Sequence, residues 1–324
     1  MTDRENAMPR ARISLLDYLQ YHGWKVVRDN GREEVAGLCP LHPDNRPSFY
    51  VNRRKQVFYC HGCGRGGGLA SLLRWLEEPA QPAPQPNPDC PAQAELLEQT
   101  YCFYQRQLLQ SGEARAYLQK RGIHDHAVIE RMRIGYAPGA CLRGFLTRLG
   151  YFPQALRQRG LVDANGRDSF FRCLTFPLAV SGSLYGRSIH NGCCRHRLLA
   201  GSKGGLYSPD SPDGPRLILV EGLLDVAALW QSGFSDANTA LGTQLNNAQL
   251  SQLCRSPSRL IYICFDTDLN GSGQRAARRL SIQLRHAGVE ALRVTLPDGY
   301  DPASFFAAGA APWDFQRCLD RATP

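Results

Sequence analysis

Three acidic residues lie where two apolar runs of strand length end. Glu221 follows the run at 217–220, and Asp266 and Asp268 end the run that begins at 260. If both runs are strands of one open α/β sheet, these side chains face the crevice at the carboxyl ends of the strands. Carboxylates that lie this close repel one another unless a cation lies between them. Oxygen ligands of this kind suit Mg²⁺, so the pattern predicts a metal site for phosphoryl or nucleotidyl transfer.

Each of these acids also has a simpler explanation when it is considered alone. An aspartate after an apolar strand is often the N-cap of the next helix, so the segment 265–268 is a weak signal by itself. The order of the two segments is more specific. A strand, Glu and Gly precede one helix, and about 45 residues later a strand and Asp-x-Asp-x-x-Gly precede another. This order favours two carboxylate-bearing turns on one sheet.

A second set of candidate ligands lies near the N-terminus, with the spacing Cys39-x₂-His42-x₁₇-Cys60-x₂-Cys63. Two close pairs separated by a hairpin-sized loop are typical of a structural zinc ribbon. Three thiolates and one imidazole complete a tetrahedral zinc and leave no open position, so we expect this site to stabilise the fold and to do no chemistry. The alternative is four chance residues on a small β-module. His61 is a competing ligand, but the x₂ spacing favours Cys63.

The elements that position these residues can be predicted from periodicity. The N-terminal part should hold a short helix at 13–22, a hairpin whose strands lie at 48–52 and 56–60, and a helix from 69 to 78. In the C-terminal part, strand-like runs at 217–222, 260–266 and 291–297 alternate with helical patterns at 223–233, 246–255 and 272–288. This alternation predicts a mostly parallel sheet. The fold class is therefore α+β and multidomain: a zinc ribbon, a mixed α/β basic subdomain and an α/β domain.

Composition and charge narrow the class of protein. The chain has 324 residues, 43% of them hydrophobic, which is enough for two or three domains. No apolar run could span a membrane, no signal region opens the chain, and the cysteines lack a disulfide pattern, so we expect a cytoplasmic protein. Residues 95–203 hold 16 Lys and Arg against 7 Asp and Glu, whereas the remainder holds 22 of each sign. This basic segment indicates a nucleic-acid track, although a solvated basic face gives the same count.

A Pro-rich stretch at 79–91 marks a domain boundary, because such sequences form extended spacers. The predicted organisation is a zinc ribbon at 1–78, a linker at 79–94, a basic subdomain at 95–215, an α/β domain at 216–310 and a C-terminal helix at 311–324. Arg172 and Arg187 lie among apolar residues of the basic subdomain. A semi-buried arginine usually pairs with an acid. Because few acids are close in sequence, we favour contact with a triphosphate or template over internal pairing.

The sequence resembles the bacterial DnaG-type DNA primases. The stretch CPLHPDNRPSFYVNRRKQVFYCHGCGRGGG at 39–68 resembles their CHC2 zinc-binding domain. VEGLLDVAAL, TALGT, CFDTDLNGSGQRAARRL and LPDGYDPASFF, at 220–229, 239–243, 264–280 and 296–306, resemble successive blocks of their Toprim domain. ARAYLQKRGI, VIERMRIGYAPG and LRQRGLVDANGRDSFFRCLTFPL, between 114 and 178, look like the start of the RNA-polymerase core. The resemblance covers the chain except for its last turns.

The resemblance implies an enzyme that synthesises short RNA primers on single-stranded DNA, a DNA-directed RNA polymerase. It implies Mg²⁺ or Mn²⁺ at catalytic acids Glu221, Asp266 and Asp268, with Asp225 and Asp301 as further ligands, and nucleotide contacts from Arg187, Lys203, Arg121 and Arg172. The zinc ribbon would select the start site on the template. Its Arg53, Arg54 and Lys55, and its aromatics Phe49, Tyr50, Phe58 and Tyr59, are suited to single strands, although half of the aromatics must face the ribbon's own core.

The same resemblance implies partners and shows departures. The expected partners are a single-stranded DNA template, ribonucleoside triphosphates and a helicase acting in trans, with no membrane and with the chain as a monomer. No segment corresponds to the family's helicase-binding domain, and no Walker-type motif is present, so we expect the chain not to be a helicase itself. Ala303 replaces an acid that the family often carries. The long DTDLNGSG loop resembles that of primases from mobile elements.

Two alternatives remain open from the sequence. A Toprim nuclease or topoisomerase-like enzyme would use the same acids, but it usually needs a separate nucleophile, and the ribbon ahead of the core favours priming. A non-catalytic single-stranded DNA-binding protein of a mobile element would need the ribbon and the basic segment only. The complete acid set argues against such a protein, because simple binding gives no reason to keep repelling carboxylates together.

Overall fold

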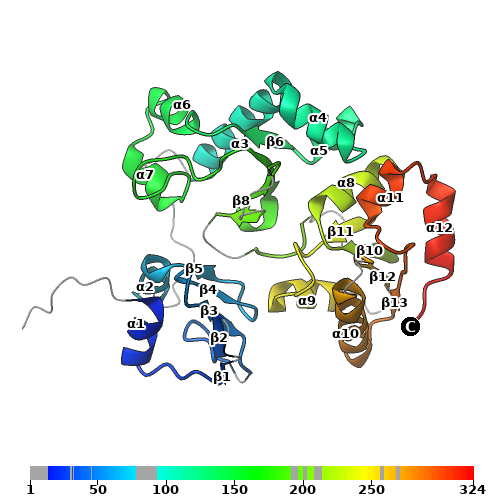
Figure 1. Cartoon of the computed structure of the whole chain (residues 1–324), viewed down its shortest axis with the longest axis horizontal. Coiled ribbons are helices and arrows are strands. Elements are labelled where there is room, and N and C mark those ends of the chain that lie inside the picture. The colour runs from blue at the N-terminus through cyan, green and yellow to red at the C-terminus, as the bar shows by residue number, and fades with distance from the viewer. Residues whose placement is uncertain are drawn as a thin grey trace, which may run out of the picture. The chain divides into compact units, whose positions relative to one another are not determined.

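The computed structural model describes residues 14–29, 31, 33–44, 46–77, 93–190, 196–199, 203–207, 214–255, 259–267 and 271–324. The chain divides into two compact units, Met1–Ala83 and Pro84–Pro324. Most of the predicted linker at 79–94 lies outside the described residues, and helix α3 already begins at Gln93. The finer division predicted within the second unit stays a prediction. Figure 1 shows the elements of each unit with their labels.

The first unit is a small antiparallel sheet with two helices. Its elements are α1 (Leu15–Tyr21), β1 (Arg28–Asp29), β2 (Glu34–Gly37), β3 (Phe49–Asn52), β4 (Val57–Cys60), β5 (Gly66–Gly67) and α2 (Leu69–Glu77). The strands pair in sequence order, β1-β2-β3-β4-β5. The predicted hairpin is confirmed by β3 and β4, in which Phe49 pairs with Cys60. Ser14 caps α1 by accepting a hydrogen bond from Asp17 N.

Alternation along β3 and β4 divides the aromatic residues between two faces, as the sequence predicts. Phe49 and Phe58 are buried and stacked, with ring centroids 4.8 Å apart. Tyr50 and Tyr59 pair on the other face, and each lies 5.0 Å from the ring of His61. This half-buried aromatic group is the part of the hairpin that does not contribute to the core.

The predicted zinc ligands converge in this unit. The ligand atoms of Cys39, His42, Cys60 and Cys63 all lie within 4.8 Å of one another. The Sγ atoms of Cys39 and Cys63 are 4.0 Å apart, and Cys60 Sγ lies 3.9 Å from His42 Nδ1. These lengths are close to the edge of about 3.8 Å that four ligands at about 2.3 Å from zinc would give. Hydrogen bonding to Cys60 raises the pKa of the Cys39 thiol, and a zinc ion would remove this shared proton. The four residues therefore fit a structural zinc ion.

The second unit begins with helices and an antiparallel sheet. The elements are α3 (Gln93–Gln110), α4 (Gly112–Lys120), α5 (His126–Arg131), β6 (Gly135–Ala137), α6 (Leu142–Arg148), α7 (Pro153–Gln158), β7 (Cys173–Leu178), the 3₁₀ turn Ala179–Ser181, β8 (Ser183–Ser188) and β9 (His196–Leu198). The strand order is β6-β7-β8-β9. Gly122, with φ +73°, follows α4 at the predicted stop, because a left-handed residue there suits glycine.

A parallel sheet completes the second unit. Its elements are β10 (Arg216–Val220), α8 (Leu223–Gln231), β11 (Ala237–Thr239), α9 (Asn247–Cys254), β12 (Leu260–Cys264), α10 (Ser272–His286), β13 (Ala291–Arg293), α11 (Pro302–Ala307) and α12 (Pro312–Asp320). All neighbours in the order β11-β10-β12-β13 are parallel, which confirms the predicted mostly parallel sheet. The strand β11 was not among the runs predicted from the sequence.

Helices cover both faces of the parallel sheet (Figure 1), because side chains alternate along each strand. Ile218 and Val220 of β10 pack in the hydrophobic cluster that includes α8, whereas Leu217 and Leu219 pack in the cluster that includes α10. The strands are therefore buried on both sides, as parallel strands usually are. Among the helices in the described ranges, none combines the length and apolar character needed to cross a lipid bilayer.

We expect one zinc ion per chain, and we expect the Cys60→Ser variant to lose it. Because metal binding and folding of such small modules are coupled, loss of zinc should remove amide-exchange protection in residues 33–77 while the second unit stays protected. Elemental analysis and hydrogen exchange measure the two effects. Cys254→Ser, at a half-buried cysteine of the second unit, is the control and should keep its zinc. Full zinc content in Cys60→Ser would disprove the ligand assignment.

Candidate functional site

Two of the predicted acids lie side by side because their strands are neighbours. β10 and β12 pair in parallel with Val220 opposite Cys264, so Glu221 and Asp266 both leave the sheet at its carboxyl edge. Asp266 N donates a hydrogen bond of 3.0 Å to Glu221 Oε1. Asp268 lies outside the described residues. The geometry thus places two of the three predicted catalytic acids at one edge of the sheet.

Gly273, in the first turn of α10, lies against both acids. A Cβ atom at this position would be 2.4 Å from the carbonyl oxygen of Asp266 and 2.8 Å from Glu221 Oε1. The first of these atoms is rigid backbone, and the second is a carboxylate whose position the site depends on. The helix can therefore approach the acidic edge this closely only because residue 273 has no side chain.

Asp225 lies one turn into α8 and is 6% exposed. Its Oδ2 accepts a hydrogen bond from Gly222 N at 3.1 Å, and its Oδ1 accepts one from Ala303 N at 3.2 Å. Burial, together with the charges of Asp301 and Asp266, raises the pKa of Asp225 to about 8. Burial is the largest cause of this shift, and the neighbouring carboxylates add to it, so a cation bound at this edge would favour the charged form of Asp225.

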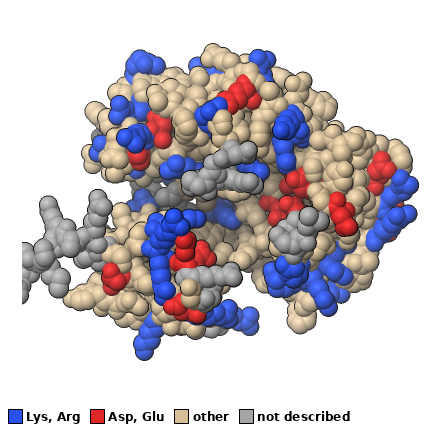
Figure 2. All heavy atoms as spheres, viewed as in Figure 1, with Lys and Arg blue, Asp and Glu red and all other residues tan. Residues whose placement is uncertain are grey.

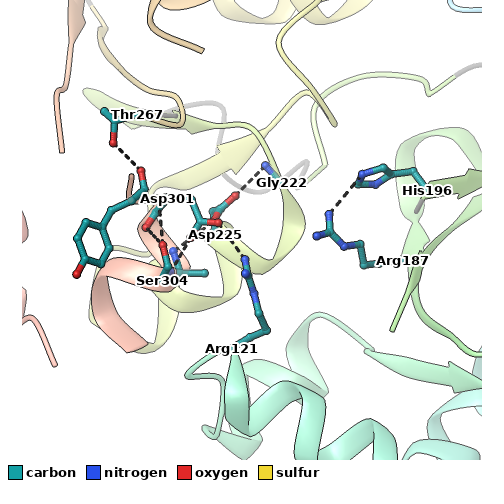
Figure 3. Close-up of polar contacts among 10 residues, drawn as sticks. Arg121, Arg187, His196, Gly222, Asp225, Thr267, Asp301 and Ser304 are labelled. Atoms are coloured by element: carbon teal, nitrogen blue, oxygen red, sulfur yellow. Dashed lines mark hydrogen bonds and ion pairs between the residues drawn. The ribbon is translucent and has the colours of Figure 1, made fainter. Parts of the chain in front are cut away.

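Asp301 is held by a cation from a distant part of the chain. Arg121 Nη2, at the end of α4, lies 3.0 Å from Asp301 Oδ2, as Figure 3 shows. Ser304 N donates a 2.6 Å hydrogen bond to Asp301 Oδ1. Burial acts to raise the pKa of Asp301, but the hydrogen bonds from Ser304 and the charge of Arg121 outweigh it and hold the pKa below its usual value.

These acids line one pocket of about 420 Å³ together with a set of cations. The acidic members are Glu221, Asp225, Asp266 and Asp301, and the basic members are Arg121, Arg187, His196, Arg197 and Lys203. All belong to the second unit. A pocket lined by carboxylates and by guanidinium and ammonium groups can bind a metal ion and a phosphate-bearing ligand together.

Arg187 of β8 reaches the pocket beside the neighbouring strand β9. Its Nη1 lies 3.4 Å from His196 Nε2, and His196 Nδ1 lies 2.5 Å from the hydroxyl oxygen of Tyr185. Figure 3 shows the Arg187–His196 contact on the side of the site opposite Asp301. Sequence reasoning selected Arg187 but missed His196 and Arg197. The only signal for them was the basic run at 195–197 in the sequence, and strand pairing brings His196 opposite Arg187.

Lys203 is held by the loop that follows β11. Its Nζ donates a 2.6 Å hydrogen bond to the carbonyl oxygen of Leu241, and burial lowers its pKa to about 8. The adjacent Gly242 N donates to the carbonyl oxygen of Glu221 at 2.9 Å. Leu241 has φ +58°, an uncommon conformation for a non-glycine residue. One short loop therefore fixes both Lys203 and the backbone of Glu221.

The structure does not place Arg172 in this pocket. Its guanidinium pairs with Glu113 Oε1, and His190 Nε2 lies 3.2 Å from the same oxygen. Few acids are close to Arg172 in sequence, but α4 brings Glu113, which is 59 residues away, into contact with it. Internal pairing, the alternative left open by the sequence, is what the structure shows. In the first unit, Arg53 and Arg54 likewise pair with Asp29 and Glu33.

The carboxylate oxygens of the acids lie farther apart than the ligand atoms of the zinc site. Within the part of the chain that the structure describes, the cysteine–histidine set is the one group of three or more potential ligands whose atoms all lie within 4.8 Å. Asp225 accepts hydrogen bonds from backbone amides, and Asp301 forms an ion pair with Arg121. Glu221 and Asp266 lie together at the strand ends. The carboxylate chemistry and the raised pKa of Asp225 fit a hard divalent cation.

We expect Gly273→Ala to weaken divalent-ion binding by about 10-fold or more, because the added methyl group displaces the carboxylate of Glu221. Mn²⁺ binding followed by electron paramagnetic resonance measures this effect, and circular dichroism checks the fold. Gly112→Ala is the matched control, since a Cβ at Gly112 meets nothing within 4 Å. Equal Mn²⁺ affinity for both variants would contradict the contact with Glu221.

Comparison with known proteins follows the same division of the chain. Residues 218–306 match a family model described as Toprim-like, and residues 20–79 match the CHC2 zinc finger model. DNA primase from Aquifex aeolicus is 30% identical over 91% of this chain and 65% of its own length. DNA primase from Escherichia coli K12 is 31% identical over 90% of this chain and 57% of its own length. The chain thus spans just under two thirds of one relative and just over half of the other.

Solved structures give the same result. The zinc-binding and RNA polymerase domains of Aquifex aeolicus primase align with a TM-score of 0.63 and 25% identity, over 96% of this chain and 83% of that one. The DnaG primase catalytic domain bound to single-stranded DNA aligns with a TM-score of 0.58 and 27% identity, over 72% of this chain and 81% of that one. With a match to the CHC2 zinc finger and another to the Toprim-like domain, the chain is similar in sequence and in fold to the bacterial DnaG-type DNA primases.

Proposed function

We propose that the protein is a DNA primase, an enzyme that synthesises short RNA primers on a single-stranded DNA template by nucleotidyl transfer. The observation that carries this proposal is the pocket that Glu221 and Asp266 line together with Arg187 and Lys203. Acids alone would serve a metal, and cations alone would serve a polyanion. Their presence in one pocket fits a nucleoside triphosphate bound with its metal ion.

We assign the residues of the pocket to two tasks. Glu221, Asp266 and Asp268 would hold Mg²⁺ or Mn²⁺, with Asp225 and Asp301 as the further predicted ligands. The bound ion would neutralise charge on the phosphates while a 3′-hydroxyl attacks an α-phosphate, the bond between the α- and β-phosphates breaks and pyrophosphate leaves. Arg187 and Lys203 would orient the triphosphate. Arg121 would contribute through Asp301, with which it is paired. Arg172 is left out of this set because Glu113 engages it.

The remaining parts of the family architecture suggest the template path and the partners. The relative solved with single-stranded DNA is a primase catalytic domain that aligns over 72% of this chain, and in this chain the basic segment at 95–203 would guide the template. The CHC2 zinc finger would select the start site, where the half-buried Tyr50 and Tyr59 offer faces for base stacking. Ribonucleoside triphosphates are the proposed substrates. A helicase acting in trans is the proposed replication partner in the cytoplasm.

A cleavage reaction finds less support in the same pocket. Tyr185 lines the pocket and is the tyrosine that a topoisomerase-like reaction would need. Burial raises the pKa of Tyr185 to about 12, and its hydroxyl group already contacts His196. The raised pKa opposes the formation of a nucleophilic phenolate at neutral pH. Nicking of supercoiled DNA without nucleotides is therefore not expected.

Asp266→Ala should lower primer synthesis by more than about 100-fold, because it removes a ligand at the sheet edge. Gel analysis of labelled oligonucleotides, made from ribonucleotides, Mg²⁺ and single-stranded DNA, measures synthesis. Zinc content and thermal unfolding should stay unchanged. Asp320→Ala, at an exposed aspartate at the end of α12, is the control and should retain activity. An active Asp266→Ala enzyme would refute the assignment of this edge as the metal site.

The KM for ribonucleotides should rise as the pH increases from 7 to 9. The ammonium group of Lys203, whose pKa is lowered to about 8, is charged below that pH and neutral above it. Its attraction for a triphosphate is therefore lost on the alkaline side. Lys203→Arg keeps a charge throughout this range and should flatten the rise. Identical pH profiles for the two enzymes would exclude Lys203 from triphosphate binding.

A further inference from the structure

One face of α10 carries a row of basic side chains, which we call the α10 stripe. Its members are Arg275, Arg278, Arg279, Arg285 and His286, with Ile282 between them. Their spacings of three and four residues place them on the same side of the helix. At a rise of about 1.5 Å per residue, the stripe extends over about 16 Å from Arg275 to His286.

The stripe faces outward because the opposite face of α10 is packed on the parallel sheet. Ala276, Ala277, Leu280 and Leu284 are buried in the cluster that also contains the inward side chains of β10 and β12. The members of the stripe are exposed. Figure 2 shows blue side chains gathered over the part of the second unit where α10 lies. The arginines are therefore available to a ligand of the size of a macromolecule.

Internal pairing does not account for the stripe. The helix contains no Asp or Glu, and no acid within the described ranges forms an ion pair with Arg278, Arg279 or Arg285. Like charges at this spacing repel and destabilise a helix by about 0.2–0.5 kcal/mol per pair. The helix dipole favours cations in the last turn, which covers Arg285 and His286 only. The arginines at 278 and 279 have no such structural reason.

The position of the stripe suggests what binds it. α10 begins at the acidic edge, where Gly273 contacts Glu221 and Asp266, and the stripe runs from this edge along the outer surface. Resting on the proposed function, we propose that the α10 stripe binds the phosphate backbone of the primer–template duplex as the duplex leaves the acidic edge. Arginine binds phosphate through a two-pronged guanidinium, which fits a row of backbone phosphates.

The composition of the stripe favours a duplex over a single strand. Sites for single strands combine cations with aromatic side chains on which unpaired bases stack. The α10 stripe has no aromatic residue apart from His286 at its end, and its one uncharged member is Ile282. In a duplex the bases are already stacked on one another, so a surface that contacts phosphates alone is sufficient. An acidic protein surface is the competing partner, and the test below separates the two.

The test compares binding of an RNA–DNA duplex with a single-stranded overhang by the full chain and by its Arg278→Gln, Arg279→Gln, Arg285→Gln triple variant. Fluorescence anisotropy at several salt concentrations gives the slope of log K against log salt. Each lost phosphate contact flattens this slope by about 0.7–0.9, so the triple variant should flatten it by about 2–3 units. The triple Lys variant keeps the charge and should keep most of the slope. Arg321→Gln, at an exposed arginine outside α10, should change little.

Single-stranded DNA and synthesis provide further readouts. The Gln triple variant should bind single-stranded DNA nearly as well as the unchanged chain, should make the first dinucleotide at a normal rate and should yield fewer long products. An unchanged duplex slope would overturn the proposal, as would an equal loss of single-strand binding. Unchanged duplex binding with lost binding of poly-glutamate would overturn it in favour of an acidic protein partner. If the unchanged protein makes no primers at all, that result would instead refute the proposed function.

Discussion

The parallel pairing of β10 with β12 is the interaction on which the site depends. Its register sets Val220 opposite Cys264, so that Glu221 and Asp266 both follow the carboxyl ends of neighbouring strands. A shift of one residue would turn one of these side chains to the other face of the sheet. The burial of both strands under helices on two faces fixes this register, since apolar side chains on either side would become misplaced together.

The acids that converge at this edge are stabilised by different partners. Asp225 accepts backbone hydrogen bonds, and Asp301 is paired with Arg121. Such contacts offset the cost of burying charge, which would otherwise oppose folding of the site. Glu221 and Asp266 lie where the strands end, in the pocket that also contains cations of β8 and Lys203. The protein's own groups thus stabilise two of the carboxylates that the proposal assigns to a cation.

The sequence predicted the parts of this arrangement that depend on local pattern. The runs of β10 and β12 are strongly apolar, and the zinc ligands have a characteristic spacing, so both could be found. The strand β11 was missed because Asn238 and Thr239 interrupt its apolar character. The pairing of Arg172 with Glu113 depends on tertiary contact and has no local signal. The α10 stripe was missed because a charge count over a long segment does not show which residues share one face of a helix.

The ion pair between Arg121 and Asp301 joins residues 180 positions apart. The parallel sheet is complete in topology from residue 216 onward, but the counter-charge of its acidic edge comes from a helix that precedes it by about a hundred residues. A fragment restricted to the sheet and its helices would retain every strand and yet carry a buried carboxylate stripped of its guanidinium. The parallel sheet and its helices therefore form a complete topology but not a complete set of charges. The region that compensates its own buried charge must also include α4 and Arg121.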